Sequence, residues 1–240
     1  EAEAFVRQIA FKKSISIAEQ SIKGEPIAYI TGVREFYGVE FAVSKDVLIP
    51  RPDTELLVEK SLEIISTHFP NSVKVADVCT GSGAIVLTLA RLIKYGDFEG
   101  VDISAKALKI ATLNKARQGA SNVQFFKHDI FSKNFKVTAD VLVSNPPYIR
   151  EKDVAKLMPD VKDFEPIIAL AGGKEGLDFY QRIAEIGKDC KFILLEIGEN
   201  MEKNVIDIFH EASYNLLFSA KDLAGKIRVL GFNNASILQN

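Results

Sequence analysis

The sequence has few of the residues that build disulfide frameworks and metal sites, with 2 cysteines and 3 histidines among 240 residues. The histidines, His68, His128 and His210, lack the spacing of metal ligands, so we expect no structural metal. Cys79 follows one apolar run and Cys190 precedes another, which would place them at opposite ends of strands in a parallel sheet. We therefore expect both thiols to be reduced.

The sequence also lacks an excess of charge of one sign and any long hydrophobic run. Its 30 Lys and Arg residues nearly balance 32 Asp and Glu residues, whereas chains that grip nucleic acid by its phosphates are typically strongly basic. We expect no stable nucleic-acid complex, although a local basic groove is compatible with this balance. No apolar run approaches the ~20 residues that span a bilayer, and the first residues are acidic where a signal peptide is positive. A cytoplasmic, monomeric protein is expected.

Apolar runs typical of strands alternate with helical patterns through most of the chain. Seven strands are predicted, at residues 73–79, 98–103, 123–129, 139–144, 191–197, 214–219 and 227–232. Helical periodicity fills most gaps between them, at residues 83–95, 105–118, 178–189 and 201–212. This alternation predicts an α/β fold with a doubly wound, mostly parallel sheet. The short turn before the last strand predicts that the last two strands pair antiparallel.

The chain changes character near residue 24. Residues 3–22 have helical character, whereas residues 24–49 bring the Gly, Pro and aromatic alternation typical of a short β-hairpin. A helix then opens at "PRPDTELLVE", with Asp53 or Thr54 as its cap. Three aromatic residues are expected to pack the hairpin against the larger domain rather than to contact a ligand: Tyr29, Phe36 and Tyr37.

Residues that directly follow the strands are candidates for a binding site, because ligands bind beyond the carboxyl ends of the strands in such sheets. In "DVCTGSGAI", Gly81 and Gly83 allow a tight turn, and the following helix offers backbone amide donors. Asp102 ends the second strand, where a carboxylate can accept both hydroxyls of a ribose. The third glycine of G-x-G-x-x-G is missing, which favours an adenosyl cofactor over NAD. Asp129 ends the third strand and either binds the adenine amine or caps a turn.

The fourth strand ends in the tetrapeptide Asn145-Pro146-Pro147-Tyr148. The Asn145 carboxamide oxygen and the carbonyl between the two prolines form a rigid pair of acceptors, which can hold both hydrogens of one NH2 group. Tyr148 offers a flat face for stacking against a planar amide or base. The alternative is a turn with a packed tyrosine. The tetrapeptide therefore predicts a site for a planar nitrogen.

These motifs resemble the S-adenosylmethionine-dependent methyltransferases that act on planar nitrogens, whose signature is (N/D)-P-P-(Y/F/W). Within that group, the chain is similar to the HemK-type protein-(glutamine-N5) methyltransferases, which modify the Gly-Gly-Gln glutamine of peptide-chain release factors. The resemblance runs from Gly24 onward and rests on "GEPIAYITGVREFYG", "IPRPDTELLVE", "DVCTGSGAI", "SNPPYI", "DFEPIIALAGGKEGLDFYQRI", "LLEIG" and "KDLAGKIRVL". Cys79 stands where the family often has glycine, and this departure is expected to narrow the cofactor turn slightly.

The resemblance implies a Rossmann-like seven-stranded methyltransferase fold that binds S-adenosyl-L-methionine. Asp102 would hold the ribose hydroxyls and Asp129 the adenine, while Asn145 would also bind the cofactor. The loop contacting the methionyl part would be Thr80, Gly81, Ser82 and Gly83. The glutamine amide would donate its two hydrogens to Asn145 and to the Pro146 carbonyl, with Tyr148 against its plane. Positioning of this kind can lower the barrier by ~7 kcal/mol or more.

The resemblance also implies a division of the chain into three parts. Residues 1–23 would be the remnant of an N-terminal helical substrate-binding domain, residues 24–49 a linker hairpin and residues 50–240 the catalytic domain. The segments "RPDTE" and "DFEP" would form loops flanking the pocket. Their charged residues, and the glutamate that ends the fifth strand, are either functional or structural: Arg51, Glu55, Glu165 and Glu196.

Three other functions remain open at the level of sequence. An exocyclic-amine methyltransferase acting on nucleic acid can use the same tetrapeptide, but the near-neutral charge and the lack of a recognisable target-recognition insert count against it. A noncatalytic adenosyl-binding module would retain the glycine turn and Asp102, but it would not need an intact Asn-Pro-Pro-Tyr motif. An NAD-dependent dehydrogenase is disfavoured by the missing glycine.

Overall fold

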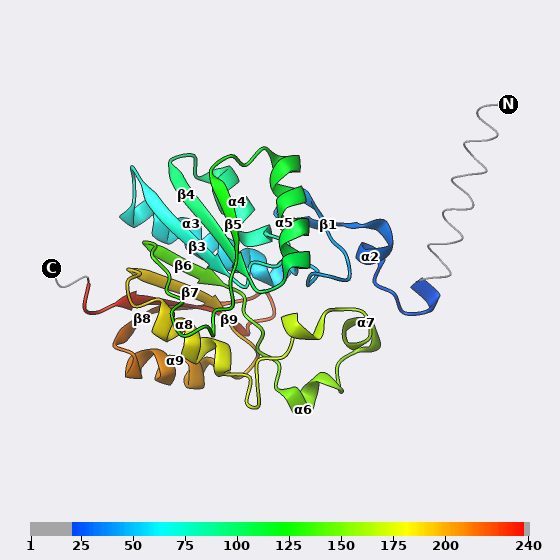
Figure 1. The fold of residues 1–240 in the computed structure, drawn as a ribbon. Coiled ribbons are helices and arrows are strands. Elements are labelled where there is room, and N and C mark those ends of the chain that lie inside the picture. Colours follow the sequence, from blue (N-terminus) through cyan, green and yellow to red (C-terminus); the bar gives the residue numbers. More distant parts are fainter. Residues whose placement is uncertain (1–20, 238–240) are drawn as a thin grey trace.

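The computed structural model describes residues 21–237, whose centre is a seven-stranded sheet with the strand order β5-β4-β3-β6-β7-β9-β8 (Figure 1). The first five strands of the sheet in sequence order pair in parallel, whereas β9 pairs antiparallel with both β7 and β8. The predicted mostly parallel sheet and its antiparallel last strand are confirmed. The strands are β3 (Val73–Val78), β4 (Gly96–Asp102), β5 (Val123–Lys127), β6 (Val141–Ser144), β7 (Phe192–Glu196), β8 (Tyr214–Lys221) and β9 (Ile227–Asn234).

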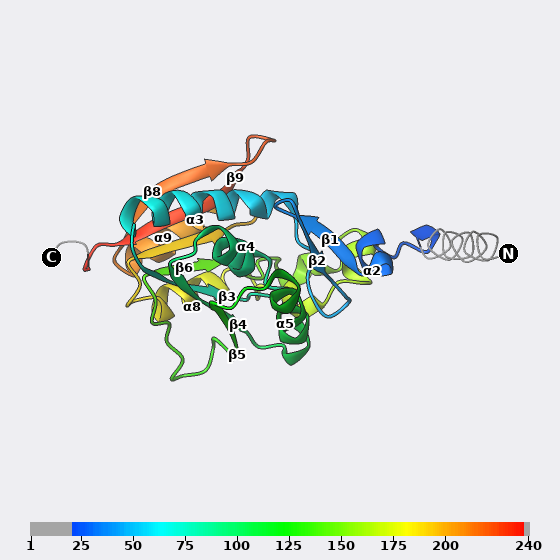
Figure 2. The same cartoon turned by 90° about the horizontal axis from the view of Figure 1, so that it is seen from above.

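Helices cover both faces of the sheet (Figures 1 and 2). On one face lie α3 (Glu55–His68) and α4 (Ala84–Leu92), with α5 (Ala105–Gln118) packed beside α4. On the other face lie α8 (Asp178–Ile186) and α9 (Glu202–Glu211). Because successive residues of a strand point to opposite faces, Val141 and Val143 join the first core and Leu142 joins the second. Burial on both sides explains why the inner strands read as continuous apolar runs.

Two helices next to the site begin in different ways. At the start of α5, the Ser104 hydroxyl accepts a hydrogen bond from the Ala107 N–H at 3.1 Å, a cap that typically contributes ~1 kcal/mol. Helix α3 was predicted to have Asp53 or Thr54 as its cap, but no side-chain cap forms there. A 3-10 turn, η1 (Pro52–Thr54), precedes α3 instead, and the Thr54 hydroxyl accepts a hydrogen bond from Asn145.

The predicted hairpin forms, but it is shorter than the segment assigned to it. Strands β1 (Val33–Phe36) and β2 (Val39–Ala42) pair antiparallel, whereas α2 (Ile27–Thr31) is helical. Pro26 precedes that helix, and Gly32 ends it with a left-handed backbone, φ 75°. Phe36 is fully buried in the core beneath α3 and α4, so the hairpin packs against the sheet domain as expected.

Three short helical segments connect β6 to α8, namely α6 (Glu151–Val154), α7 (Pro159–Lys162) and η2 (Ile167–Ala169). They lie at the same end of the molecule as the hairpin (Figure 1). The helix predicted over residues 3–22 falls almost entirely outside the described residues. Between residues 21 and 237, no helix combines the length and the apolar character needed to cross a bilayer.

Candidate active site

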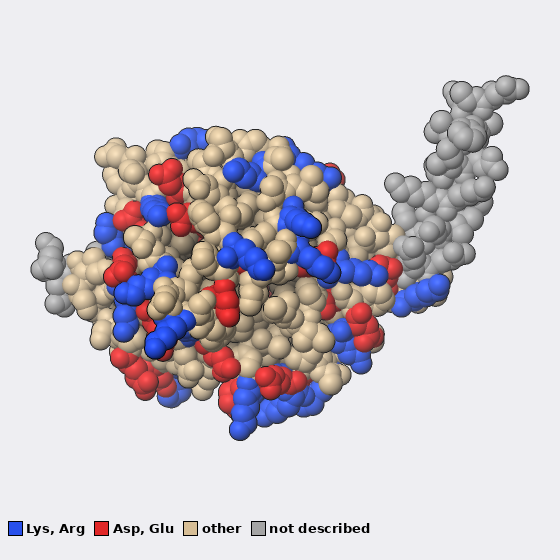
Figure 3. Space-filling model, viewed as in Figure 1, with Lys and Arg blue, Asp and Glu red and all other residues tan. Residues whose placement is uncertain are grey.

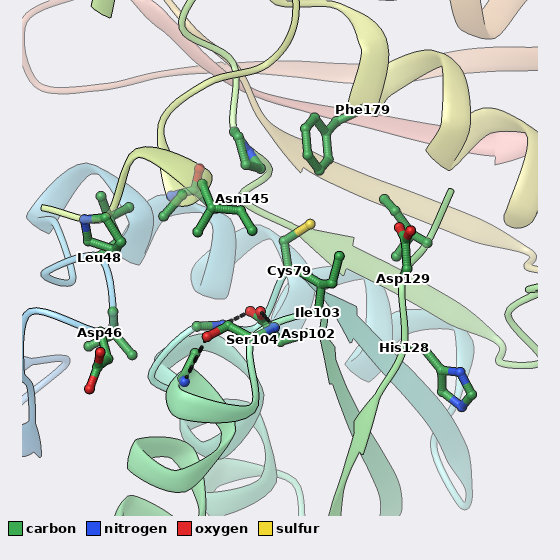
Figure 4. Close-up of a pocket in the computed structure, with 18 of the residues that line it drawn as sticks. Asp46, Leu48, Cys79, Asp102, Ile103, Ser104, His128, Asp129, Asn145 and Phe179 are labelled. Carbon is green, nitrogen blue, oxygen red and sulfur yellow. Dashed lines mark hydrogen bonds between the residues drawn. The ribbon is translucent and has the colours of Figure 1, made fainter. Parts of the chain in front are cut away.

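A cleft opens beyond the carboxyl ends of β3, β4, β5 and β6, with an empty volume of about 770 Å³ that includes the part open to solvent (Figure 4). This is the edge of a doubly wound sheet where ligands bind. Five residues predicted from the sequence line it: Gly81, Asp102, Asp129, Asn145 and Pro147. The other five predicted site residues are not among the residues that line the cleft: Thr80, Ser82, Gly83, Pro146 and Tyr148.

The glycine-rich loop between β3 and α4 has left-handed backbone at three positions: Cys79 (φ 62°), Gly81 (φ 55°) and Gly83 (φ 80°). A Cβ added at Gly81 would meet nothing within 4 Å, so this glycine leaves space next to the cleft. A Cβ at Gly83 would lie 3.0 Å from the Leu87 side chain, so Gly83 serves close packing. The two glycines therefore have different roles, one in the cleft and one in the core.

Buried hydrogen bonds fix this loop from below. The Thr80 hydroxyl donates to Asp77 Oδ2 at 2.6 Å, and both residues are buried. Burial raises the pKa of Asp77 to about 7, while the Thr80 hydrogen bond favours its ionised form. Thr80 therefore supports the loop, and its predicted contact with the methionyl part of a cofactor stays a prediction, as does that of Ser82.

Asn114 on α5 is a structural residue of the site that was not predicted. Its side chain is fully buried and joins the hairpin to the glycine-rich loop. Asn114 Oδ1 accepts from the Ala42 N–H at 2.7 Å, and Nδ2 donates to the carbonyls of Ala42 at 3.1 Å and Ser82 at 2.9 Å. An asparagine within a helical pattern was the only sequence signal, because both partners lie far away in the chain.

Asp102 presents its carboxylate at the end of β4. One oxygen, Oδ2, accepts from the Gly81 N–H at 2.9 Å, and the other, Oδ1, accepts from the Ser104 N–H at 2.8 Å. Burial raises the pKa of Asp102, and these backbone donors act in the opposite direction. Each carboxylate oxygen has further lone pairs. The arrangement therefore orients Asp102 rigidly and leaves it able to accept hydrogen bonds from a ligand.

Asp129 takes part in a turn, as one of its two interpretations proposed, and it also lies at the cleft. Its Oδ1 accepts from the Phe131 N–H at 2.9 Å, which makes it part of a turn, and its side chain is exposed at the cleft. In Figure 4 the Asp129 carboxylate lies on the same side of the cleft as Phe179, whereas the His128 ring points away. Contact with adenine stays a prediction.

Asn145 follows β6 directly and is held by its neighbours. The preceding Ser144 hydroxyl donates to the Val78 carbonyl at 2.6 Å, which ties the ends of β6 and β3 together. Asn145 Nδ2 donates to the Thr54 hydroxyl at 3.2 Å. This bond fixes the orientation of the Asn145 amide, with the NH2 group towards Thr54 and the carbonyl oxygen available as an acceptor. Among residues 21–237, no N–H or hydroxyl donates to the Pro146 carbonyl.

Tyr148 is half-buried, and burial raises the pKa of its phenol. A Cβ at Gly198, in the loop after β7, would lie 3.0 Å from Tyr148 Cδ2, so this glycine makes room for the ring. Tyr148 lies outside the residues that line the cleft. Its stacking role stays a prediction.

The charged residues of the two flanking loops are held by structural contacts. Arg51 and Glu165 form an ion pair between their loops, and Glu165 is only 4% exposed. The Glu55 carboxylate accepts from the Tyr37 N–H at 2.9 Å and so anchors the hairpin turn to α3. Glu196, at the end of β7, is 2% exposed, and burial raises its pKa to about 7.

The cleft also contains residues that were not singled out from the sequence. They come from the segment after the hairpin, from the loops after β4 and β5, and from η2 and α8: Asp46, Val47, Leu48, Ile103, Phe131, Ile168, Ala169 and Phe179. Cys79 lines the cleft too, and Figure 4 shows its sulfur directed towards the open space. Both cysteines are free thiols, as expected.

Comparisons with known proteins agree with this architecture. A methyltransferase from Pyrococcus furiosus superimposes with a TM-score of 0.60 at 16% identity, over 83% of this chain and 90% of that one. The magnesium protoporphyrin IX methyltransferase of Synechocystis PCC 6803, solved with bound S-adenosylmethionine, superimposes with a TM-score of 0.54 at 14% identity, over 76% of this chain and 80% of that one. These similarities establish the Rossmann-like methyltransferase fold.

Sequence comparisons are more specific. The family model described as "Methyltransferase small domain" matches residues 54–160. The release factor glutamine methyltransferase of Clostridium acetobutylicum is 42% identical over 234 residues, which cover 94% of this chain and 81% of that protein. The protein of the same name from Bacillus subtilis is 40% identical over 232 residues, with 92% and 78% covered. The chain therefore belongs to the release factor glutamine methyltransferase family.

Proposed function

We propose that this protein transfers the methyl group of S-adenosyl-L-methionine to the side-chain amide nitrogen (N5) of the glutamine in the Gly-Gly-Gln motif of a peptide-chain release factor. The observation that carries this proposal is the orientation of Asn145 at the end of β6. Its NH2 group is bound to Thr54, so its carbonyl oxygen is available to accept a hydrogen from an incoming amide.

The cleft suits an adenosyl cofactor. Gly81 leaves open space next to the cleft, and Asp102 keeps acceptor capacity on both oxygens, as recognition of a ribose diol requires. The loop after β5 forms one end of the cleft, and Asp129 lies exposed there. Its carboxylate would accept a hydrogen bond from the adenine amine. When bound, S-adenosylmethionine supplies an electrophilic methyl group on a sulfonium.

The contribution of the protein is to orient the acceptor nitrogen. An amide nitrogen is a weak nucleophile because its lone pair is delocalised into the carbonyl group. Asn145 Oδ1 and the Pro146 carbonyl would accept its two hydrogens and thereby direct the lone pair, while Tyr148 would confine the amide plane. The two prolines fix the backbone that carries this pair of acceptors. Holding the reacting groups in this way supplies ~7 kcal/mol or more.

No strong general base is needed at the nitrogen. The amide nitrogen becomes acidic as it acquires the methyl group, so one of its protons can leave after transfer. The acceptors that hold the two hydrogens are neutral carbonyl oxygens, which favours positioning over proton abstraction in the rate-limiting step.

The rim of the cleft suits a protein loop. Three of its lining side chains are large, apolar and exposed: Ile103 (43%), Phe131 (47%) and Ile168 (56%). Basic and acidic side chains are interspersed on the face shown in Figure 3. These features support a release factor as the partner rather than nucleic acid.

We also infer a catalytic unit from residue 50 onward, a hairpin linker at 24–49, a monomeric state and a cytoplasmic location.

The amide-holding role can be tested with Asn145→Ala, assayed by transfer of labelled methyl to purified release factor. Loss of one positioned hydrogen bond in a desolvated site is expected to lower kcat by ~100-fold or more. Asn122→Ala is the matched control, because Asn122 donates one hydrogen bond, to the Gly96 carbonyl, and lies outside the cleft lining. Near-wild-type methylation by the Asn145 variant would refute the amide-holding mechanism.

A further inference from the structure

Glu196 is a buried acid next to the proposed acceptor site that the mechanism above does not use. Ser144 of β6 pairs with Leu195 of β7, so the next residues along these parallel strands, Asn145 and Glu196, lie side by side at the two strand ends. Glu196 is 2% exposed. Its Oε2 has no hydrogen-bond partner among the described residues. An unpartnered buried carboxylate oxygen is costly, and this one lies next to the amide that is proposed to hold the substrate.

Several groups face Glu196 from the surrounding elements. The side chains of Thr54 in η1 and of Asn145 favour its ionised form, as does the positive charge of Arg228 on β9. Burial is the largest effect and opposes ionisation. Two tyrosines and one further carboxylate complete the surroundings: Tyr148, Tyr180 and Asp53.

We propose that Glu196 is a positioning residue that acts through Thr54 to fix the orientation of the Asn145 amide. The Thr54 hydroxyl accepts a hydrogen from Asn145 Nδ2, so its own hydrogen is free to be donated onward to ionised Glu196. In this series of hydrogen bonds, Asn145 donates to Thr54 and Thr54 donates to Glu196. The series cannot run the other way while Glu196 is ionised, so it keeps Asn145 Oδ1 facing the acceptor glutamine. The inference rests on the proposed function, because it concerns the efficiency of that same amide site.

Protonation of Glu196 would reverse this effect. A protonated carboxyl group is a donor as well as an acceptor, so it would no longer fix the direction in which the Thr54 hydroxyl donates. The new O–H would compete for Asn145 Oδ1 or favour a flipped amide that presents NH2 to the substrate. The clamp would then repel the glutamine NH2 group instead of binding it. Because burial raises the pKa of Glu196 to about 7, the change falls near neutral pH.

The test is the pH dependence of kcat for release-factor methylation between about pH 5.5 and 8.5, at saturating S-adenosylmethionine. For the wild-type enzyme, kcat should rise with pH and level off above about pH 7. Glu196→Gln should lower the plateau ~10-fold and flatten the profile, with cofactor affinity retained. Glu199→Gln, which alters an exposed glutamate in the next loop, is the control and should keep the wild-type profile.

Variants of Thr54 distinguish positioning from a general structural effect. Thr54→Val should lower kcat ~10-fold, and Thr54→Ser, which keeps the hydroxyl, should recover most of that loss. Glu196→Gln combined with Thr54→Val should cost no more than either change alone, because both break one chain of hydrogen bonds. A flat wild-type profile, a Glu196→Gln profile that still rises with pH, or additive losses would overturn the inference. Lack of methylation by the wild-type enzyme would instead refute the proposed function itself.

Discussion

Asn114 offers a sharp test of how the site is held together, because one buried amide links three parts of the molecule. Asn114→Ala would remove its three hydrogen bonds and leave the Ala42 N–H, the Ala42 carbonyl and the Ser82 carbonyl without this partner. All three residues are buried: Asn114 is 0% exposed, and Ala42 and Ser82 are 4% exposed each. Water therefore has little access to replace the lost bonds.

The expected cost follows from these contacts. A typical hydrogen bond contributes ~1 kcal/mol net, and a buried polar group left unsatisfied costs ~1–3 kcal/mol. Three such groups give a loss of ~3–9 kcal/mol in the free energy of unfolding, which is comparable to the ~5–15 kcal/mol typical of a domain. Release of the Ser82 carbonyl should also loosen the glycine-rich loop and weaken S-adenosylmethionine binding ~10-fold.

Urea unfolding and calorimetric titration with S-adenosylmethionine would measure both effects. Asn114→Asp keeps the acceptor for Ala42 but loses both donations, so it should also be strongly destabilised. Thr112→Ala, an exposed change on the same helix, is the control and should lie within ~0.5 kcal/mol of wild type. An Asn114→Ala protein less than ~1 kcal/mol below wild type, with unchanged cofactor affinity, would refute this role.

Three further predictions concern the cofactor loop and the buried acids. Asp102→Asn replaces one acceptor oxygen by an NH2 donor that faces a backbone N–H. The affinity for S-adenosylmethionine, measured by calorimetry, should therefore be ~10–100-fold weaker. An affinity equal to that of the wild type would argue against ribose recognition by Asp102. Cys79 has a left-handed backbone, with a φ of 62°, which a β-branched residue adopts poorly and glycine adopts easily. Cys79→Val should therefore lower the free energy of unfolding by ~1–2 kcal/mol, and Cys79→Gly should not. Equal urea midpoints for the two variants would show that the backbone at this position is unstrained. The pKa values of Asp77 and Glu196 are raised from 3.8 and 4.5 to about 7. Both acids are therefore still protonated in the folded state at pH values where they have ionised in the unfolded state, so stability should fall as pH rises from about 4 to 7 and level off above. Urea unfolding across this range should show a smaller decline for Asp77→Asn, and an identical decline would contradict the assignment.

The fold was largely predictable from the sequence because burial on both faces makes each strand a continuous apolar run. Each predicted strand contains or overlaps the observed one closely, as with 139–144 against Val141–Ser144. The hairpin was less predictable, since Ile27–Thr31 became a helix where alternation suggested extended chain. The conformation of such a short segment depends only weakly on the intrinsic propensities of its residues and strongly on how they pack against the rest of the protein.

The site was predictable only where residues follow strands directly. Asp102 and Asn145 lie at the cleft because topology brings the carboxyl ends of parallel strands together. Residues whose roles depend on distant partners could not be assigned. Thr54 was expected to cap a helix, yet its hydroxyl accepts from Asn145, 91 positions away. The partner of Arg51 is Glu165, 114 positions away, and neither sequence context indicates the other.

The most direct test of the proposed function is methyl transfer from labelled S-adenosylmethionine to purified release factor, run beside a release factor in which the Gln of Gly-Gly-Gln is replaced. We expect label on the intact factor and none on the substituted one, which would establish donor, acceptor and reaction together. Equal labelling of both factors, or labelling of nucleic acid while the intact factor stays unlabelled, would contradict the assignment of this cleft to glutamine methylation.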